Sequence, residues 1–192
     1  MTSNGIETEV KIRISEVRQL QASLERSGFR LHVSRQFESN SLYDTSDQTL
    51  RRKGAILRLR QCGENSVITW KEPVEEGPFK SRVELETTLG SLDTMRQILE
   101  RLGYRQVFRY EKFRTEYVET GDPDTGVLTI DETPIGNFLE LEGPGEWIDR
   151  NAQQLGFSRK DYILLSYGKL YLEECKRGGV EPADMLFASH SQ

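Results

Sequence analysis

The stretch Glu7–Arg13 reads E-T-E-V-K-I-R, with an ionisable residue at every second position and apolar Val10 and Ile12 between them. Successive side chains of a strand point to opposite faces, so this stretch predicts a strand with one charged face and one apolar face. The same alternation returns in L-R-L-R at 57–60 and in L-E-L-E at 139–142. One such strand usually indicates the solvated face of a half-covered sheet. Recurrence on most strands indicates instead a shared, charged surface.

Composition narrows the class of protein. The 192 residues fit one domain, or two small halves with a common core. The net charge of −5 argues against nucleic-acid binding through a basic surface. No apolar run approaches the roughly 18 residues of a membrane helix. The N-terminus lacks a basic segment followed by an apolar one, so no secretory signal is expected. Cys62 and Cys175 are expected to be reduced thiols. We therefore expect a cytoplasmic protein that binds neither nucleic acid nor membrane. Its oligomeric state stays open, a homodimer included.

An internal repeat divides the chain into two similar units. The segment L-E-R-S-G-F-R, which begins at Leu24, recurs as L-E-R-L-G-Y-R, which begins at Leu99. Each unit reads as a charged strand, a helix and further strands, and the two are joined by the exposed Pro- and Gly-containing segment 72–79.

The boundaries of the expected elements follow from apolar periodicity and turn residues. Helices are expected from Ser15 to Gly28, from Ser91 to Gly103, at 147–155 and at 161–173. After the charged strand of each unit, strands are expected at 36–44, 55–61, 66–71, 107–118, 126–131 and 138–142. Residues 1–175 then form one domain, and residues 176–192 a frayed polar tail. This pattern predicts an α+β fold whose antiparallel strands curl into a barrel or tunnel with helices outside.

A charged interior has chemical consequences. A buried, unpaired charge costs several kcal/mol, so the inward cations and carboxylates must meet each other, water or a charged ligand. Clustered carboxylates without His or Cys favour Mg²⁺ or Mn²⁺, and clustered Arg and Lys bind phosphate oxygens. A cavity with both groups suits a nucleotide or polyphosphate with bound metal, and phosphoryl transfer needs little more. The P-loop pattern is absent from the sequence.

A set of short motifs follows in a characteristic order along the chain. They are E-T-E-V-K at 7–11, Y-D-T at 43–45, L-R-L-R at 57–60, T-W-K at 69–71, R-V-E-L-E at 82–86, E-K-F-R at 111–114, I-D at 130–131 and L-E-L-E at 139–142. In this set, residues 5–173 resemble the CYTH family, the triphosphate tunnel metalloenzymes named for class IV adenylyl cyclase and thiamine triphosphatase. The resemblance implies an eight-stranded antiparallel tunnel, built from two similar halves, that binds a triphosphate with Mg²⁺ or Mn²⁺.

The resemblance also implies roles for individual residues. The acids expected to face the metal are Glu7, Glu9, Asp131, Glu140 and Glu142. The cations expected to hold phosphate are Lys11, Arg58, Arg60, Lys71, Arg82, Lys112, Arg114 and, further along the chain, Lys169. Glu84 and Glu86 are expected to orient those cations. Tyr43 and Lys71 match a pair that activates water in some triphosphatases of the family, and in that role Tyr43 points inward toward Lys71. The alternative is that Tyr43 only ends its strand before the turn at Asp44, and that Lys71 contacts phosphate without a catalytic role.

Three activities fit these residues. The first, which we favour, is hydrolysis of the terminal phosphoanhydride of tripolyphosphate or a nucleoside triphosphate, because Asp131, Glu140 and Glu142 offer carboxylates enough for two metal ions. The second is a class IV-like adenylyl cyclase that makes cyclic AMP and pyrophosphate. The third is a binder of polyphosphate or nucleotide without turnover. Thiamine triphosphate is disfavoured, because Ala55 and Ile56 stand where the thiamine enzymes have a Trp, and Trp70 is expected to point away from the tunnel.

Overall fold

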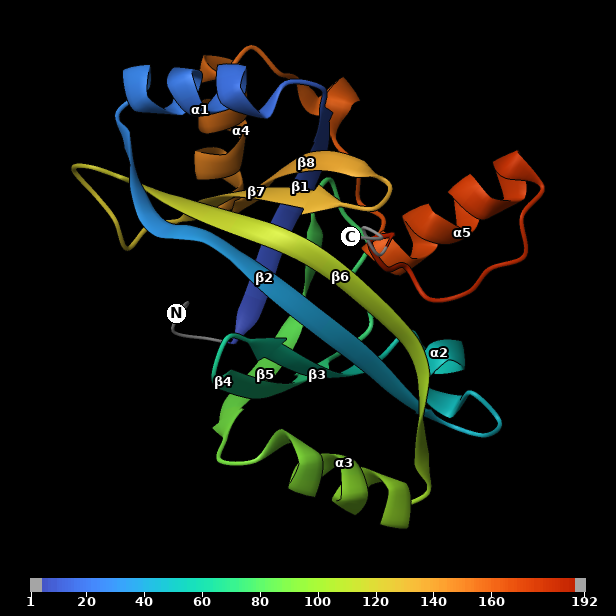
Figure 1. Ribbon diagram of the computed structural model, residues 1–192. Helices are drawn as coiled ribbons and strands as arrows, with labels where there is room; N and C mark the ends of the chain where they lie inside the picture. The colour runs from blue at the N-terminus through green and yellow to red at the C-terminus, as the bar shows by residue number, and fades with distance from the viewer. Residues whose placement is uncertain (1–4, 189–192) are drawn as a thin grey trace.

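The computed structural model describes residues 5–188 and confirms an eight-stranded antiparallel barrel with helices outside (Figure 1). The elements are, in order, β1 (Ile6–Ile14), α1 (Val17–Arg26), β2 (Phe29–Thr45), α2 (Thr49–Lys53), β3 (Ile56–Cys62), β4 (Asn65–Lys71), β5 (Lys80–Leu89), α3 (Leu92–Arg101), β6 (Tyr104–Glu119), β7 (Val127–Thr133), β8 (Gly136–Glu142), α4 (Gly145–Gln154), the 3₁₀ turn η1 (Arg159–Asp161) and α5 (Tyr167–Gly178). The barrel closes in the order β1-β5-β4-β3-β2-β6-β7-β8.

The internal repeat appears as two units that meet along two seams. Helix α3 begins as far after α1 along the chain as the second copy of the repeated segment begins after the first. The long strand β6 begins at the same distance after β2. Strand β1 pairs with β5, with Glu7 opposite Arg82, and β2 pairs with β6 along most of its length. Strands that are equivalent in the repeat are therefore neighbours in the closed barrel, and because each pair is antiparallel, Phe29 and its equivalent Tyr104 lie at opposite ends of the β2–β6 pair. Gly28 and Gly103 end the two helices at φ +85° and +90°, a left-handed conformation that suits glycine.

The apolar face of the barrel points outward, beneath the helices. Val10 and Ile12 of β1 have no more than 1 % of their surface exposed, and they belong to a cluster that includes Leu24 of α1 and Trp147 and Ile148 of α4. A second cluster joins β3 to α2 and α3. A third cluster lies against α5 and is not part of this outer face, because its members Tyr110 and Phe138 alternate with the inward-facing Lys112 and Glu140. Trp70 packs against the second cluster, so the expectation that it points away from the tunnel is confirmed. Covering the outside with helices leaves the charged faces to line the interior.

Helix boundaries differ most from the prediction near the C-terminus. The helix expected at 161–173 is instead the short turn η1, an extended link and then α5. Within that link the backbone of Ile163 pairs with Lys11, beyond the last residue that β1 pairs with β5. Helix α2 was not anticipated, since its five residues are too few to show a period.

The segment 183–187 packs against β6, so the predicted frayed tail from residue 176 is wrong over this part of the chain. The Met185 backbone bonds to Arg109 and Glu111, and its side chain is 1 % exposed. The ring of Phe187 lies 5.2 Å from that of Phe113. Residues 189–192 lie outside the described residues, as do residues 1–4. Among the described residues, no helix is long and apolar enough to cross a membrane.

Candidate active site

The barrel encloses a cavity of ≈ 620 Å³, here called the tunnel. Its walls carry charges of both signs at close spacing. The described cations on them are Lys11, Arg58, Arg60, Lys71, Lys80, Arg82, Lys112 and Arg114. The described acids on them are Glu7, Glu9, Glu84, Glu86, Glu116, Glu140 and Glu142. The structure therefore brings together seven of the eight predicted phosphate contacts and all but one of the predicted metal-facing acids.

Lys11 lies between two carboxylates of the tunnel wall. Its Nζ donates to Glu9 at 2.9 Å and pairs with Glu140 at 2.8 Å, and the side chain is 3 % exposed. Burial alone would lower the pKa of Lys11, but Glu140 and Glu9 raise it above its ordinary value. Lys11 is therefore a fixed positive charge on the tunnel wall.

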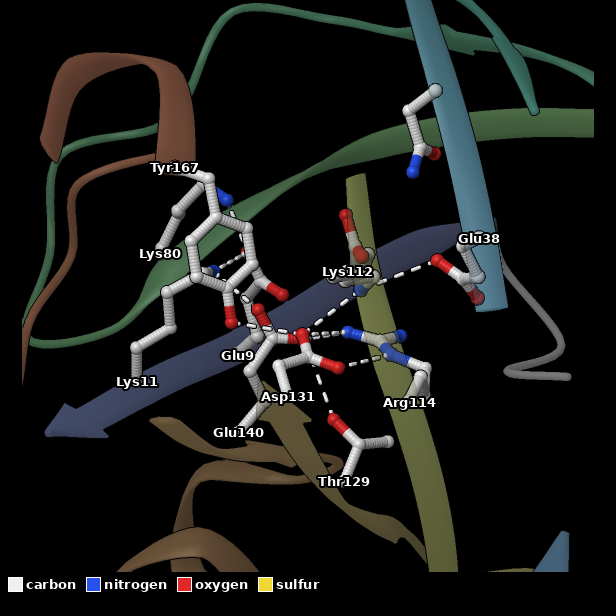
Figure 2. A network of polar contacts seen from close by, with 12 residues as sticks. Glu9, Lys11, Glu38, Lys80, Lys112, Arg114, Thr129, Asp131, Glu140 and Tyr167 are labelled. Carbon is white, nitrogen blue, oxygen red and sulfur yellow. Dashed lines mark hydrogen bonds and ion pairs between the residues drawn. The ribbon is translucent and has the colours of Figure 1, made fainter. Parts of the chain in front are cut away.

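Asp131 is not among the residues that line the tunnel. It lies within a network of polar contacts with Lys112, Arg114 and Tyr167 (Figure 2). It accepts from Lys112 Nζ at 2.8 Å, from Arg114 at 2.7 and 2.6 Å, and from the Tyr167 hydroxyl at 2.8 Å. Burial acts to raise the pKa of this carboxyl, but Arg114 and Lys112 hold it well below its usual range. Because both oxygens are occupied and the residue is 0 % exposed, the geometry does not match the predicted metal-facing role. Asp131 instead positions the two cations.

Strand β2 supplies two buried polar groups that face Arg60 and Lys112. Asn40 Oδ1 accepts from Arg60 Nε at 3.0 Å, while Asn40 Nδ2 has no hydrogen-bond partner within residues 5–188 and the residue is 0 % exposed. Glu38 lies 3.5 Å from Arg60 and 3.4 Å from Lys112. Nearby, Arg58 donates to Thr69 at 3.0 Å and leaves its buried Nε without a partner among the described residues. Unsatisfied buried donors of this kind are costly unless a ligand meets them.

Lys71 and Lys80 are both held by acids. Lys71 Nζ donates to Glu7 at 2.9 and 3.0 Å and pairs with Glu84. Lys80 pairs with Glu9, and burial together with Lys11 lowers the pKa of Lys80 to about 8. A carboxylate oxygen of Glu84 also lies 3.5 Å from the Arg58 guanidinium. This position is compatible with the predicted role of Glu84 in orienting the cations. Glu86 lies beside the same guanidinium, at 3.4 Å.

Glu142 differs from the other acids, because no hydrogen bond or ion pair reaches its carboxylate within residues 5–188. Burial, Glu7 and Glu9 raise its pKa to about 7. A cation bound at this point would relieve the repulsion, and three carboxylates are the oxygen donors that Mg²⁺ and Mn²⁺ prefer. As the side chains stand, no group of three such ligands within the described part of the chain has the spacing to hold an ion. The carboxylates of Glu7, Glu9 and Glu142 are therefore of the right chemical type to bind the metal. In this structure Glu7 forms an ion pair with Lys71, and Glu9 forms one with Lys80.

The predicted pairing of Tyr43 with Lys71 is wrong. In the register of β2 and β3, Leu42 lies opposite Arg58 and Tyr43 opposite Leu57. Leu42 therefore faces the tunnel, and Tyr43 belongs to the outer apolar cluster with Leu57. The Y-D-T motif did not reveal the outward position of Tyr43, because the register of a strand with its neighbours decides which of its alternate side chains face inward.

Tyr43→Phe is accordingly expected to leave kcat within about twofold of wild type. The substitution removes a hydroxyl on the outer face of the barrel that is hydrogen-bonded to Arg96. It is therefore expected to lower the free energy of unfolding, on the order of 1 kcal/mol. Steady-state kinetics and urea unfolding of the variant separate the two effects. A hundredfold fall in kcat at unchanged stability would contradict this placement.

Lys169 is exposed and does not line the tunnel. It lies on the first turn of α5 and borders a second cavity outside the barrel. The predicted contact between Lys169 and phosphate in the tunnel is therefore not supported by its position.

Sequence reasoning missed several residues that lie at the tunnel. Lys80 lines the tunnel and extends the alternation of Arg82, Glu84 and Glu86 by one step. Glu38 and Asn40 do not line the tunnel but contact its cations, and they alternate with Leu42, so the same pattern carried these signals. Two further residues are aromatic. Tyr110 alternates with Lys112 on β6, whereas Tyr167 comes from a helix and had no sequence signal.

Comparison with known proteins agrees with this architecture. The family model of the CYTH domain matches residues 5–167. The chain belongs to the CYTH domain family. A protein of Methanocaldococcus jannaschii named "Putative adenylate cyclase" is 29 % identical over 137 residues, which cover 71 % of this chain and 76 % of that protein.

Solved structures share the fold of this CYTH domain. A protein of Vibrio parahaemolyticus described as a "putative adenylate cyclase" has a TM-score of 0.75 at 22 % identity, over 86 % of this chain and 97 % of its own. A Hippeastrum protein, described as a "putative adenylyl cyclase" with a dominant triphosphatase activity, has a TM-score of 0.60 at 17 % identity, over 92 % and 97 %. At these identities the structures establish the shared fold.

Proposed function

We propose that this CYTH protein is a metal-dependent enzyme that hydrolyses the terminal phosphoanhydride of a triphosphate. One observation carries the proposal: a ≈ 620 Å³ tunnel whose walls hold eight described cations, with a buried guanidinium nitrogen of Arg58 left unsatisfied. A chain of phosphate groups supplies the oxygens that such donors lack. Family membership and the triphosphatase activity named for the Hippeastrum protein support the same reading.

Different residues of the tunnel contact phosphate, position the cations and hold the metal ion. Arg58, Arg60 and Arg82 contact phosphate oxygens, as do the lysines of β1, β4 and β6. Asp131 and Glu38 hold Lys112 in place for that contact. Glu7, Glu9 and Glu142 are the residues that would hold Mg²⁺ or Mn²⁺, and such an ion, when bound, neutralises phosphate charge and polarises the phosphoryl group. With Tyr43 outside the barrel, hydrolysis relies on positioning and charge neutralisation, with water as nucleophile.

An adenylyl cyclase is the second candidate, favoured by the names of the archaeal and Vibrio relatives. The products decide between the activities. The purified protein is incubated with Mn²⁺ or Mg²⁺ and either ATP or tripolyphosphate. We expect orthophosphate from both substrates. Cyclic AMP with pyrophosphate from ATP, and no orthophosphate from tripolyphosphate, would identify a cyclase, while saturable binding without product would identify a binder.

Ligand binding is expected to stabilise the fold. Tripolyphosphate supplies oxygens to the guanidinium nitrogens of Arg58 and Arg82 that lack hydrogen-bond partners among the described residues. A ligand that binds only the folded protein stabilises it by about 2.7 kcal/mol when free ligand is at 100 times Kd. Thermal denaturation should show a rise in Tm of several degrees at millimolar ligand. Arg58→Gln should reduce the rise, whereas Arg101→Gln, at the exposed end of α3, should keep it. An unchanged Tm in wild type would count against the tunnel as a triphosphate site.

A further inference from the structure

Among the described residues, two tyrosines line the tunnel: Tyr110 of β6 and Tyr167 of α5. The Tyr167 hydroxyl donates to Asp131 at 2.8 Å, so its proton is bonded within the protein. The Tyr110 hydroxyl is instead hydrogen-bonded to Arg58. The two tyrosines therefore differ in how the hydroxyl proton is used, and the residues assigned above to phosphate and metal do not include Tyr110.

The charged groups around the Tyr110 hydroxyl are hydrogen-bond donors. Arg58 lies on β3, and Arg60 and Lys112 are the other charged groups that act on the phenol. Guanidinium and ammonium groups donate hydrogen bonds and accept none, so the phenol oxygen is the acceptor in its bond with Arg58. Within residues 5–188, the phenol proton meets no acceptor. A ligand that brings acceptor oxygens into the tunnel would therefore complete the hydrogen bonding of Tyr110.

Packing and charge both prepare the Tyr110 hydroxyl to donate. The side chain is 9 % exposed, and its ring stacks on Phe108 with 6.0 Å between the ring centroids. Burial acts to raise the pKa of the phenol, but Arg58, Arg60 and Lys112 lower it below its ordinary value. A hydrogen bond from Arg58 to the phenol oxygen also polarises the O–H bond, which makes the hydroxyl a stronger donor. The hydroxyl is thus held on the tunnel wall with its proton available to a ligand.

We propose that the Tyr110 hydroxyl contacts the triphosphate directly, as an uncharged donor to a phosphate oxygen next to Arg58. The inference rests on the proposed triphosphate function and adds to it a residue that none of the charged motifs contains. Arg58 supports it, because its buried Nε also lacks a hydrogen-bond partner within the described part of the chain. Phosphate groups carry several acceptor oxygens, so one ligand supplies what both side chains lack.

Removal of single hydroxyl groups tests this contact. Tyr110→Phe removes the hydroxyl and keeps the ring that stacks on Phe108. Tyr43→Phe is the matched control, because it removes a hydroxyl that lies outside the tunnel. The ligand is a triphosphate analogue in which methylene groups replace both bridging oxygens, so that it is not hydrolysed. Calorimetry with Mg²⁺ gives the Kd of this analogue, and thermal denaturation confirms that each variant is folded.

Tyr110→Phe is expected to raise Kd for the analogue about fivefold or more, and Tyr43→Phe to change it less than about twofold. Combination with Arg58→Gln separates a direct contact from an effect through Arg58. A direct contact predicts that Tyr110→Phe still raises Kd in the Arg58→Gln protein, by about threefold or more. A hydroxyl that only holds Arg58 predicts no further change there. An unchanged Kd for Tyr110→Phe in either protein would overturn the inference and leave the tunnel as a triphosphate site. If the wild-type protein does not bind the analogue, the proposed function itself fails, and the role of Tyr110 with it.

Discussion

Glu142→Gln is expected to lower kcat at least tenfold at low metal concentration, which corresponds to a barrier higher by about 1.4 kcal/mol. The same substitution should stabilise the metal-free protein at pH 8 by about 3 kcal/mol, because it removes a buried charge next to Glu7 and Glu9. A variant that is more stable without metal yet less active points to a metal ligand, since a purely structural residue would lose stability on replacement.

The pH dependence of this stabilisation follows from the raised pKa of Glu142. Its pKa is about 7 in the folded protein, against an ordinary 4.5, so the folded state holds a proton that the unfolded state releases in this window. The destabilising effect of Glu142 is therefore complete above pH 7 and absent below about pH 4.5. Urea unfolding in EDTA from pH 8 to pH 4.5 should show the difference between variant and wild type shrink toward zero.

Glu9→Gln provides a control of opposite sign. Burial acts to raise the pKa of Glu9, but Lys11 and Lys80 hold it well below its ordinary value, so its charge stabilises the fold. Removing that charge should destabilise the metal-free protein. If Glu142→Gln behaves like Glu9→Gln, the repulsion among the three carboxylates is not present in solution.

Asp131→Asn is expected to reduce the free energy of unfolding by about 3–5 kcal/mol, even without metal or ligand. The substitution leaves Lys112 and Arg114 buried beside a neutral amide, in a network that also includes the Tyr167 hydroxyl. Urea unfolding in EDTA measures the loss. Because the pKa of Asp131 is depressed in the folded protein, its contribution is present above its ordinary pKa of 3.8 and disappears as the pH falls through the lower, folded-state value.

The matched control for this loss is Asp124→Asn, in the exposed turn before β7, where a change within about 0.5 kcal/mol is expected. Excess Mn²⁺ should not restore the stability of Asp131→Asn. Restoration by Mn²⁺, or a loss below about 1 kcal/mol, would return Asp131 to the metal site that its motif implied.

The alternating charges predicted the inner face of the barrel because strand periodicity is a local property. Glu7, Glu9 and Lys11 share one face whatever their strand pairs with, and the same holds for Arg58 and Arg60. These residues all line the tunnel. Tyr43 was misplaced for the complementary reason: its motif carries no charge alternation, and only pairing with β3 shows that its neighbour Leu42 faces inward.

The sequence by itself determined the charged barrel, its two repeated units and most of the cations on its inner wall. The reason is that the alternation of charges and the repeated segment are local patterns of the sequence, visible without knowledge of tertiary contacts. The tertiary structure decided which acid partners which cation. Asp131 and Glu142 belong to similar motifs, yet Asp131 is enclosed by Lys112, Arg114 and Tyr167, whereas Glu142 faces Glu7 and Glu9. Burial and charge in the interior depend on contacts between residues far apart in the chain. Those contacts exist only once the barrel has closed and α5 has packed against it.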